Sequence, residues 1–108
     1  MKYMLLVCAD ENVQVNPQEA SPEAWVEEAE RRGLRKDGSR LRPVSDATTV
    51  RLRNGEVLLS DGPFAETKEQ IAGFDLLECD NLDEAIEIAS KHPVARYGAI
   101  EVRPFWQD

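Results

Sequence analysis

The sequence predicts an α+β protein in which one antiparallel sheet is covered on one face by two helices. Three observations lead to this prediction. Apolar runs typical of strands lie near both ends of the chain and at residues 74–79, two stretches carry signals that start and stop helices, and an Asn-Gly turn joins two β-rich runs. The predicted order is β-α-β-β-β-α-β, and 108 residues fit one domain spanning residues 1–108.

The first strand and the first helix are expected in the N-terminal third of the chain. Residues 3–8 form a near-continuous apolar run, as in a strand covered on both faces, and residues 9–20 are polar and irregular. Ser21 is suited to cap a helix that has proline at its first position and ends at Gly33. The inner side of this helix carries Trp25, Val26 and Ala29. Residues 36–42 are interpreted as a basic, glycine-containing connector.

A β-hairpin over residues 48–60 is the clearest local prediction. Asn54-Gly55 is typical of a type I′ turn, and counting outward from it pairs Leu52 with Val57 and Val50 with Leu59. These four side chains form an apolar face. The opposite face carries Thr49, Arg51, Arg53, Glu56, Leu58 and Ser60. The pattern therefore predicts a hairpin with one buried face.

Residues 61–79 are expected to contain a loop, a helical turn and a strand. Pro63 must end the second hairpin strand, because proline has no backbone donor. Residues 67–70 have capping-box spacing, and Gly73 is expected to end a short helical turn. Residues 74–79 return to a strand pattern.

The second helix and the last strand complete the expected order. Asn81 is suited to cap the helix, Lys91 and His92 suit its C-terminal dipole, and Pro93 ends it. The expected buried stripe consists of Leu82, Ala85, Ile86 and Ala89. Residues 99–103 form the last strand, in which Ile100 and Val102 point under the helices while Ala99, Glu101 and Arg103 point to the other face.

Composition restricts the function classes. The chain has 13 basic and 21 acidic residues and a net charge of −8, so nucleic acid and anionic membranes are not expected partners. The N-terminal apolar stretch is too short for a signal-peptide core, and a cytoplasmic location is expected. Cys8 and Cys79 are expected to be small buried hydrophobes rather than disulfide or zinc ligands.

One block carries a family resemblance. Residues 61–69 read DGPFAETKE, and further matches lie at residues 47–51, 83–85 and 98–104. With these motifs in this order, the chain from residue 3 to residue 104 resembles the YCII-related family, in its DGPF branch. The resemblance implies a ferredoxin-like fold of the dimeric α/β-barrel type, with the hairpin as an insertion. Two such sheets pack face to face and enclose pockets between the subunits of a homodimer.

The resemblance and the residue types together nominate a site near the DGPF loop. Asp61 is the candidate general base or substrate anchor, although it is at least as well suited to cap the turn. Arg103 is suited to clamp a carboxylate or phosphate, or to form a structural ion pair with Asp61, Glu66 or Glu101. The other candidate ligand-binding residues are Arg51, Glu66, Lys68, Asp75 and Glu101. Asp75 stands where relatives commonly carry an aromatic residue.

No cofactor or metal is expected, since one histidine and two separated cysteines offer few ligands. Some members of the wider family are thought to use a His–Asp pair with the histidine near the first helix, where this chain has none. Transfer of that mechanism is therefore unsupported.

Three hypotheses of function follow from these observations. The first is a binding or regulatory homodimer with a small-molecule pocket near the DGPF loop; the resemblance also implies a link to sigma factors. The alternative is a cofactor-independent lyase or isomerase that acts on a small anionic or phenolic metabolite, with Asp61 as acid or base. A purely structural dimer is a third hypothesis.

Overall fold

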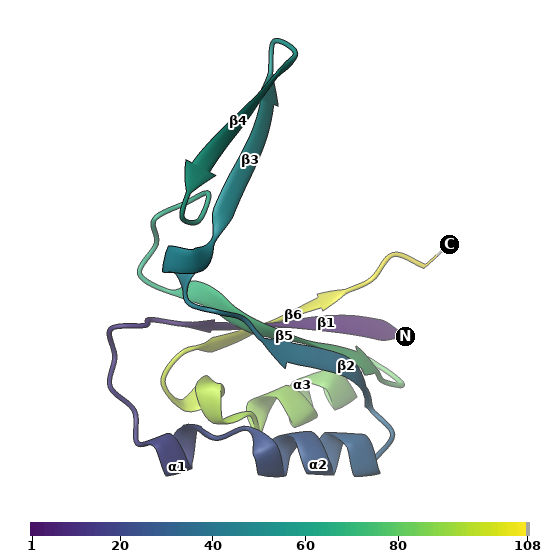
Figure 1. Ribbon diagram of the computed structural model, residues 1–108. Coiled ribbons are helices and arrows are strands. Elements are labelled where there is room, and N and C mark those ends of the chain that lie inside the picture. The colour runs from purple at the N-terminus through teal and green to yellow at the C-terminus, as the bar shows by residue number, and fades with distance from the viewer. Residues whose placement is uncertain (108) are drawn as a thin grey trace.

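A four-stranded antiparallel sheet forms the centre of the protein, as the computed structural model shows in Figure 1 for residues 1–107. The strands lie in the order β2-β5-β1-β6. Their bounds are Arg35–Arg40 for β2, Gln70–Glu78 for β5, Lys2–Ala9 for β1 and Ala99–Pro104 for β6. Strands β3 (Thr48–Arg53) and β4 (Glu56–Asp61) form a separate two-stranded sheet. The predicted ferredoxin-like α+β architecture is confirmed.

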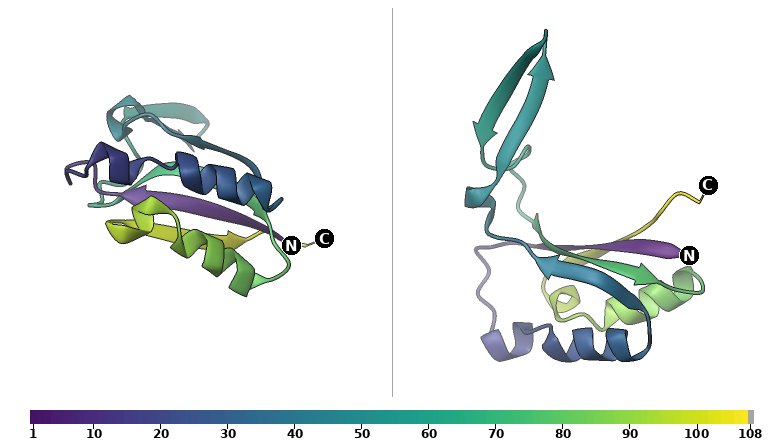
Figure 2. Two further views of the ribbon diagram at one scale, coloured as in Figure 1. Left: turned by 90° about the horizontal axis from the view of Figure 1, so that it is seen from below. Right: turned by 45° about the vertical axis from the view of Figure 1, so that its right-hand side comes forward.

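Two helices cover one face of the four-stranded sheet, α2 (Glu23–Arg31) and α3 (Leu82–Ser90). They lie side by side in the view from below in Figure 2, and an Arg32–Glu87 ion pair of 2.6 Å links them. Three shorter segments are also helical: α1 (Pro17–Ala20) and the 3₁₀ turns η1 (Val44–Asp46) and η2 (Pro93–Arg96). None of the helices in residues 1–107 is long and apolar enough to cross a membrane.

The core lies between the sheet and the helices. Strand β1 alternates, with Tyr3, Leu5 and Val7 buried on the helix side and the residues between them half-buried on the other. The first strand is thus covered by helices on one face only, rather than on both as expected. Buried side chains from the helices complete this core, namely Trp25, Ala29, Ala85, Ile88 and Ala89.

The helix boundaries agree with the sequence signals in most respects. Gly33 adopts φ +72° and ends α2, and the Asn81 side chain accepts a hydrogen bond of 2.9 Å from the Glu84 N–H at the start of α3. The cap of α2 is Pro22 rather than Ser21, whose hydroxyl lies 3.5 Å from the Glu23 nitrogen. The expected buried stripe of α3 is partly wrong. Ile88 is fully buried, whereas Leu82 and Ile86 are about half exposed because they lie on the outer side of the helix.

Strand β2 replaces the connector that the sequence suggested. Its six residues, RKDGSR, include no apolar side chain, so no hydrophobic pattern marks it. Backbone pairing with β5 holds it at the edge of the sheet, with Gly38 opposite Asp75 and Ser39 opposite Phe74. The structure also has α1 within the stretch expected to be irregular.

The expected helical turn over residues 67–73 is wrong, because β5 begins at Gln70. Ile71 pairs with Cys8 and Gln70 pairs with Ala9, so these residues extend the strand predicted to start at Phe74. The Thr67 hydroxyl donates to the Glu69 carbonyl at 2.6 Å instead of capping a helix.

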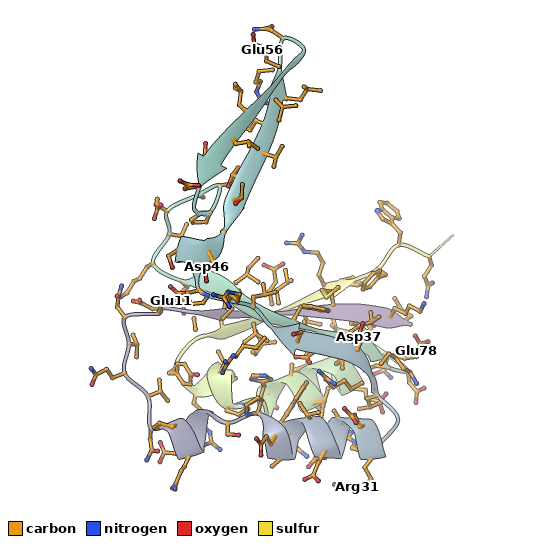
Figure 3. All side chains as sticks on the ribbon, viewed as in Figure 1. Glu11, Arg31, Asp37, Asp46, Glu56 and Glu78 are labelled. Carbon is orange, nitrogen blue, oxygen red and sulfur yellow. The ribbon has the colours of Figure 1, made fainter. Side chains whose placement is uncertain are left out.

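The β3–β4 hairpin has the predicted register throughout, from Arg53 opposite Glu56 to Val50 opposite Leu59. Asn54 and Gly55 have φ of 51° and 78°, as a type I′ turn requires. The hairpin projects away from the open face of the sheet, and Figure 3 shows its side chains standing clear of other elements up to Glu56 at the tip. Its apolar face, expected to be buried, is exposed within this single chain.

Candidate functional site

The loop after β4 is fixed by the start of β3. Gly62, at φ +96°, donates its N–H to the Ala47 carbonyl at 2.7 Å and accepts from the Thr49 hydroxyl at 2.8 Å. Farther along, the Gln70 amide donates to the carbonyls of Ala65 and Thr67 at 3.0 and 3.2 Å. These bonds hold the DGPF segment in one conformation at the base of the hairpin.

A groove of about 500 Å³ lies at this base. Its lining is mainly apolar and includes Pro63 and Phe64 of the DGPF segment together with Leu41, Val44 and Ile71. Phe64 is 78% exposed. The charged groups here are Arg42 and Asp46, which pair with each other at 2.9 Å. Asp61 is not among the lining residues; it is exposed at the last position of β4, opposite Thr48.

The candidate residues named from the sequence lie in three separate places. Asp61, Glu66 and Lys68 are exposed on and after β4, and Arg51 is half-buried on β3 opposite Leu58. Glu101 and Arg103 are exposed on β6 and form an ion pair, one of the structural pairs expected for Arg103. Asp75 is buried on the helix side of β5. The single chain therefore does not bring these residues together at the DGPF loop.

Asp75 is part of an ion-pair network that the sequence did not reveal. Its Oδ1 accepts from Arg35 Nε at 2.8 Å, and Arg35 Nη1 also donates to Glu30 at 3.0 Å. Gly38, directly opposite Asp75, makes room for this pair. A Cβ at position 38 would overlap the Asp75 carboxylate and lie 2.8 Å from the Phe74 carbonyl oxygen. Burial raises the pKa of the Asp75 carboxyl, and the hydrogen bond and charge of Arg35 lower it in part.

His92 is buried and neutral, which corrects its expected role as a cation at the end of α3. Its Nδ1 accepts from the Val94 N–H at 3.1 Å and so caps the η2 turn. Its ring meets Trp25 edge-on, with centroids 4.7 Å apart, and the Trp25 indole donates to the Ile88 carbonyl at 2.7 Å. Burial lowers the pKa of His92 to about 4. An imidazole that is uncharged at neutral pH cannot interact with the helix dipole as a cation.

Asp75, Arg35 and His92 all line a second cavity of about 510 Å³, between α2 and the sheet. We call it the helix-side cavity; Arg40, Glu23, Val26 and Val94 also line it. Of the residues that line this cavity, only Asp75 is among the site residues predicted from the sequence. The others carry no motif, and Arg35 and Arg40 fall in or next to the segment interpreted as a connector.

The remaining reactive groups are less suited to chemistry. Burial raises the pKa of the Cys8 and Cys79 thiols, so neither is a ready nucleophile. In the part of the chain that the structure describes, no three His, Cys, Asp or Glu side chains are grouped so that they could hold a metal ion.

The fold and the loop define the class of the protein, a ferredoxin-like α+β domain with an inserted hairpin. The model of the YCII-related domain matches residues 1–107, and the chain belongs to this family. It is also similar to an uncharacterized protein of Rhizobium meliloti (strain 1021), with 48% identity over 68 residues. That match covers 61% of this chain and 55% of the relative, so the similar region spans about half of the relative's length.

Proposed function

We propose that the protein is a homodimer that binds a small molecule in the groove beside the DGPF loop, in a binding or regulatory role. The exposed apolar face of the hairpin is the observation that carries this proposal. Val50, Leu52, Val57 and Leu59 are each 64 to 68% exposed and stand side by side. A contiguous apolar face of this kind on a small protein marks an interaction surface.

A second copy of the chain fits this surface. The open face of the sheet carries half-buried Met4, Leu6, Phe74 and Leu76, on the side toward which the hairpin projects. One chain thus offers both an apolar arm and an apolar sheet. A two-fold dimer uses the same pair of surfaces twice, and it leaves neither unpaired.

The DGPF groove lies where this arm meets the sheet. In a dimer, the partner would cover the groove near Phe64 and turn an open surface into an enclosed pocket. A ligand needs such enclosure, because small-molecule sites bury most of the ligand surface. Binding is favoured over acid–base catalysis because Asp61 does not line the groove. Catalysis by Asp61 as a lyase or isomerase remains the alternative prediction.

Two neighbouring leucines provide a matched test. Leu59 lies on the apolar face of the hairpin and Leu58 on the opposite face, and both are exposed, so neither Leu59→Asp nor Leu58→Asp should disturb folding. A buried leucine contributes about 2 kcal/mol. A two-fold dimer buries each leucine twice, so Leu59→Asp is expected to weaken dimerisation by about 1,000-fold or more.

Light scattering coupled to size exclusion measures the result. The wild type and Leu58→Asp are expected to elute as dimers and Leu59→Asp as a monomer. A wild type that remains a 12.2 kDa species at all concentrations would overturn the dimer. A thermal-shift screen of small carboxylates and phenols tests binding in the groove. It should identify ligands that raise the Tm of the wild type but not that of Leu59→Asp or Phe64→Ala. The absence of any such ligand would refute the binding role.

A further inference from the structure

The helix-side cavity lies within one chain, on the opposite side of the sheet from the DGPF groove. Its volume of about 510 Å³ falls within the range of small-molecule sites, roughly 300 to 1,000 Å³. It combines apolar side chains, among them Val26 and Val94, with a small number of polar groups. Its polar groups indicate what it would bind.

The deep part of the cavity presents a hydrogen-bond acceptor. Asp75 is only 5% exposed, and its Oδ1 is engaged by Arg35. Within the described residues, the hydrogen bond of the Asp75 side chain is made by Oδ1, and Oδ2 makes none. Every fully buried side-chain oxygen and nitrogen among these residues has a hydrogen-bond partner, so Oδ2 cannot be fully buried. The second oxygen, Oδ2, therefore keeps access to the cavity that Asp75 lines.

A hydrogen-bond donor lies in the same cavity. His92 is 5% exposed, and its Nδ1 accepts from a backbone N–H, so the proton of the neutral ring must be on Nε2. Within residues 1–107 the His92 side chain makes its hydrogen bond through Nδ1, and Nε2 makes none. Because no fully buried side-chain nitrogen of the described residues lacks a partner, Nε2 is not fully buried, and its N–H is a donor accessible to a ligand in the cavity that His92 lines.

The charged groups set the net charge of the ligand. Arg35 and Asp75 neutralise each other, and Arg35 is further shared with Glu30. The remaining charged residues of the lining are Arg40 and Glu23, and both are exposed at its outer part. Arg40 attracts one anionic group, while Glu23 disfavours a multiply charged ligand such as a phosphate ester.

We infer that the helix-side cavity binds a hydroxylated monocarboxylic acid with an apolar body. The carboxylate binds Arg40 at the outer part, the body packs against Val26 and Val94, and the hydroxyl meets Asp75 or His92. This site is separate from the DGPF groove and requires no dimer.

Matched probe pairs and a matched variant pair test the inference. The probes are 3- and 4-hydroxybenzoate and 4-hydroxybutyrate, each compared with benzoate or butyrate, which lack the hydroxyl group. A pocket with buried polar groups rejects the analogue that leaves them unpaired. We expect at least one hydroxylated probe to bind about tenfold or more tightly than its counterpart by isothermal titration calorimetry, since about 1.4 kcal/mol is tenfold in affinity.

The variants locate the bound probe. Arg40→Gln should weaken binding of the carboxylate about tenfold or more, whereas Arg42→Gln, two residues farther along and outside the cavity lining, should not. His92→Asn keeps an acceptor for the Val94 N–H but has no Nε2, and it is expected to reduce the preference for the hydroxyl group. Since Arg40 is exposed, its substitution leaves folding intact.

The homodimer with its DGPF groove and the ligand site in the helix-side cavity can be refuted independently. A probe bound equally by Leu59→Asp and the wild type, but lost in Arg40→Gln, supports the helix-side cavity whatever the oligomeric state. No binding by any hydroxylated probe, or equal loss in Arg40→Gln and Arg42→Gln, would overturn the inference.

Discussion

Protonation of His92 is expected to make the protein less stable in mild acid. Burial lowers the pKa of the folded-state imidazole to about 4, against an ordinary value of 6.5 in an unfolded chain. Between these two values the unfolded chain binds a proton that the folded protein does not. The contribution of His92 to stability is therefore fully present above pH 6.5 and is lost as the pH falls toward 4.

The size of the effect follows from the pKa change. A fall from 6.5 to about 4 corresponds to about 3 kcal/mol. Small domains have total stabilities of about 5 to 15 kcal/mol, so this loss is large enough to measure by urea denaturation. Trp25 touches the His92 ring and is a suitable fluorescent reporter, in a Trp106→Phe background that removes the exposed second tryptophan.

His92→Asn is the matched control. The asparagine oxygen can replace Nδ1 as the acceptor for the Val94 N–H, but it does not titrate. The variant is expected to be less stable than the wild type at pH 7 and to lose about 3 kcal/mol less on going toward pH 4. Equal losses in the two proteins would show that His92 is not the group responsible, and would refute the argument from burial.

Two further predictions concern the network around Asp75. Gly38→Ala should destabilise the protein by about 1 to 3 kcal/mol in urea denaturation, because the new Cβ would overlap the Asp75 carboxylate. Ser39 is exposed on the same strand, so the control Ser39→Ala should change stability by less than about 0.5 kcal/mol. For Asp75 the folded-state pKa is raised, so its contribution is present in acid and is lost as the pH rises through the folded pKa. Relative to the wild type, Asp75→Asn should therefore gain stability as the pH rises from 4 to 7, measured as the change in Tm; a parallel pH profile would contradict the raised pKa.

The parts of the fold that the sequence predicts well are those with a strong local cause. The hairpin register follows from the Asn54-Gly55 turn alone, because the turn type fixes which residues face each other. The Asn81 cap and the Gly33 stop are likewise local. The family resemblance is equally a matter of short motifs, and it gave the correct fold.

The errors have a common physical origin in tertiary context. The capping-box spacing predicts a helical turn that includes Gln70 and Ile71, but pairing with β1 decides their conformation. Ile88 replaces Ile86 in the core because the orientation of α3 depends on the sheet below it. His92 has the sequence position of a helix-end cation, and only its surroundings show that it is buried.

Strand β2, which the sequence does not predict, also supplies residues that line the proposed cavity. An apolar strand at this edge would have been recognised from its pattern, but its side chains would have filled the space under α2. Instead β2 supplies Arg35, which pairs with Asp75, Gly38, which leaves room for that pair, and Arg40, which carries the outer charge. Because β2 has only polar residues and glycine, no hydrophobic pattern predicts it. The same polar residues give the cavity its charged groups beside the apolar side chains of Val26 and Val94.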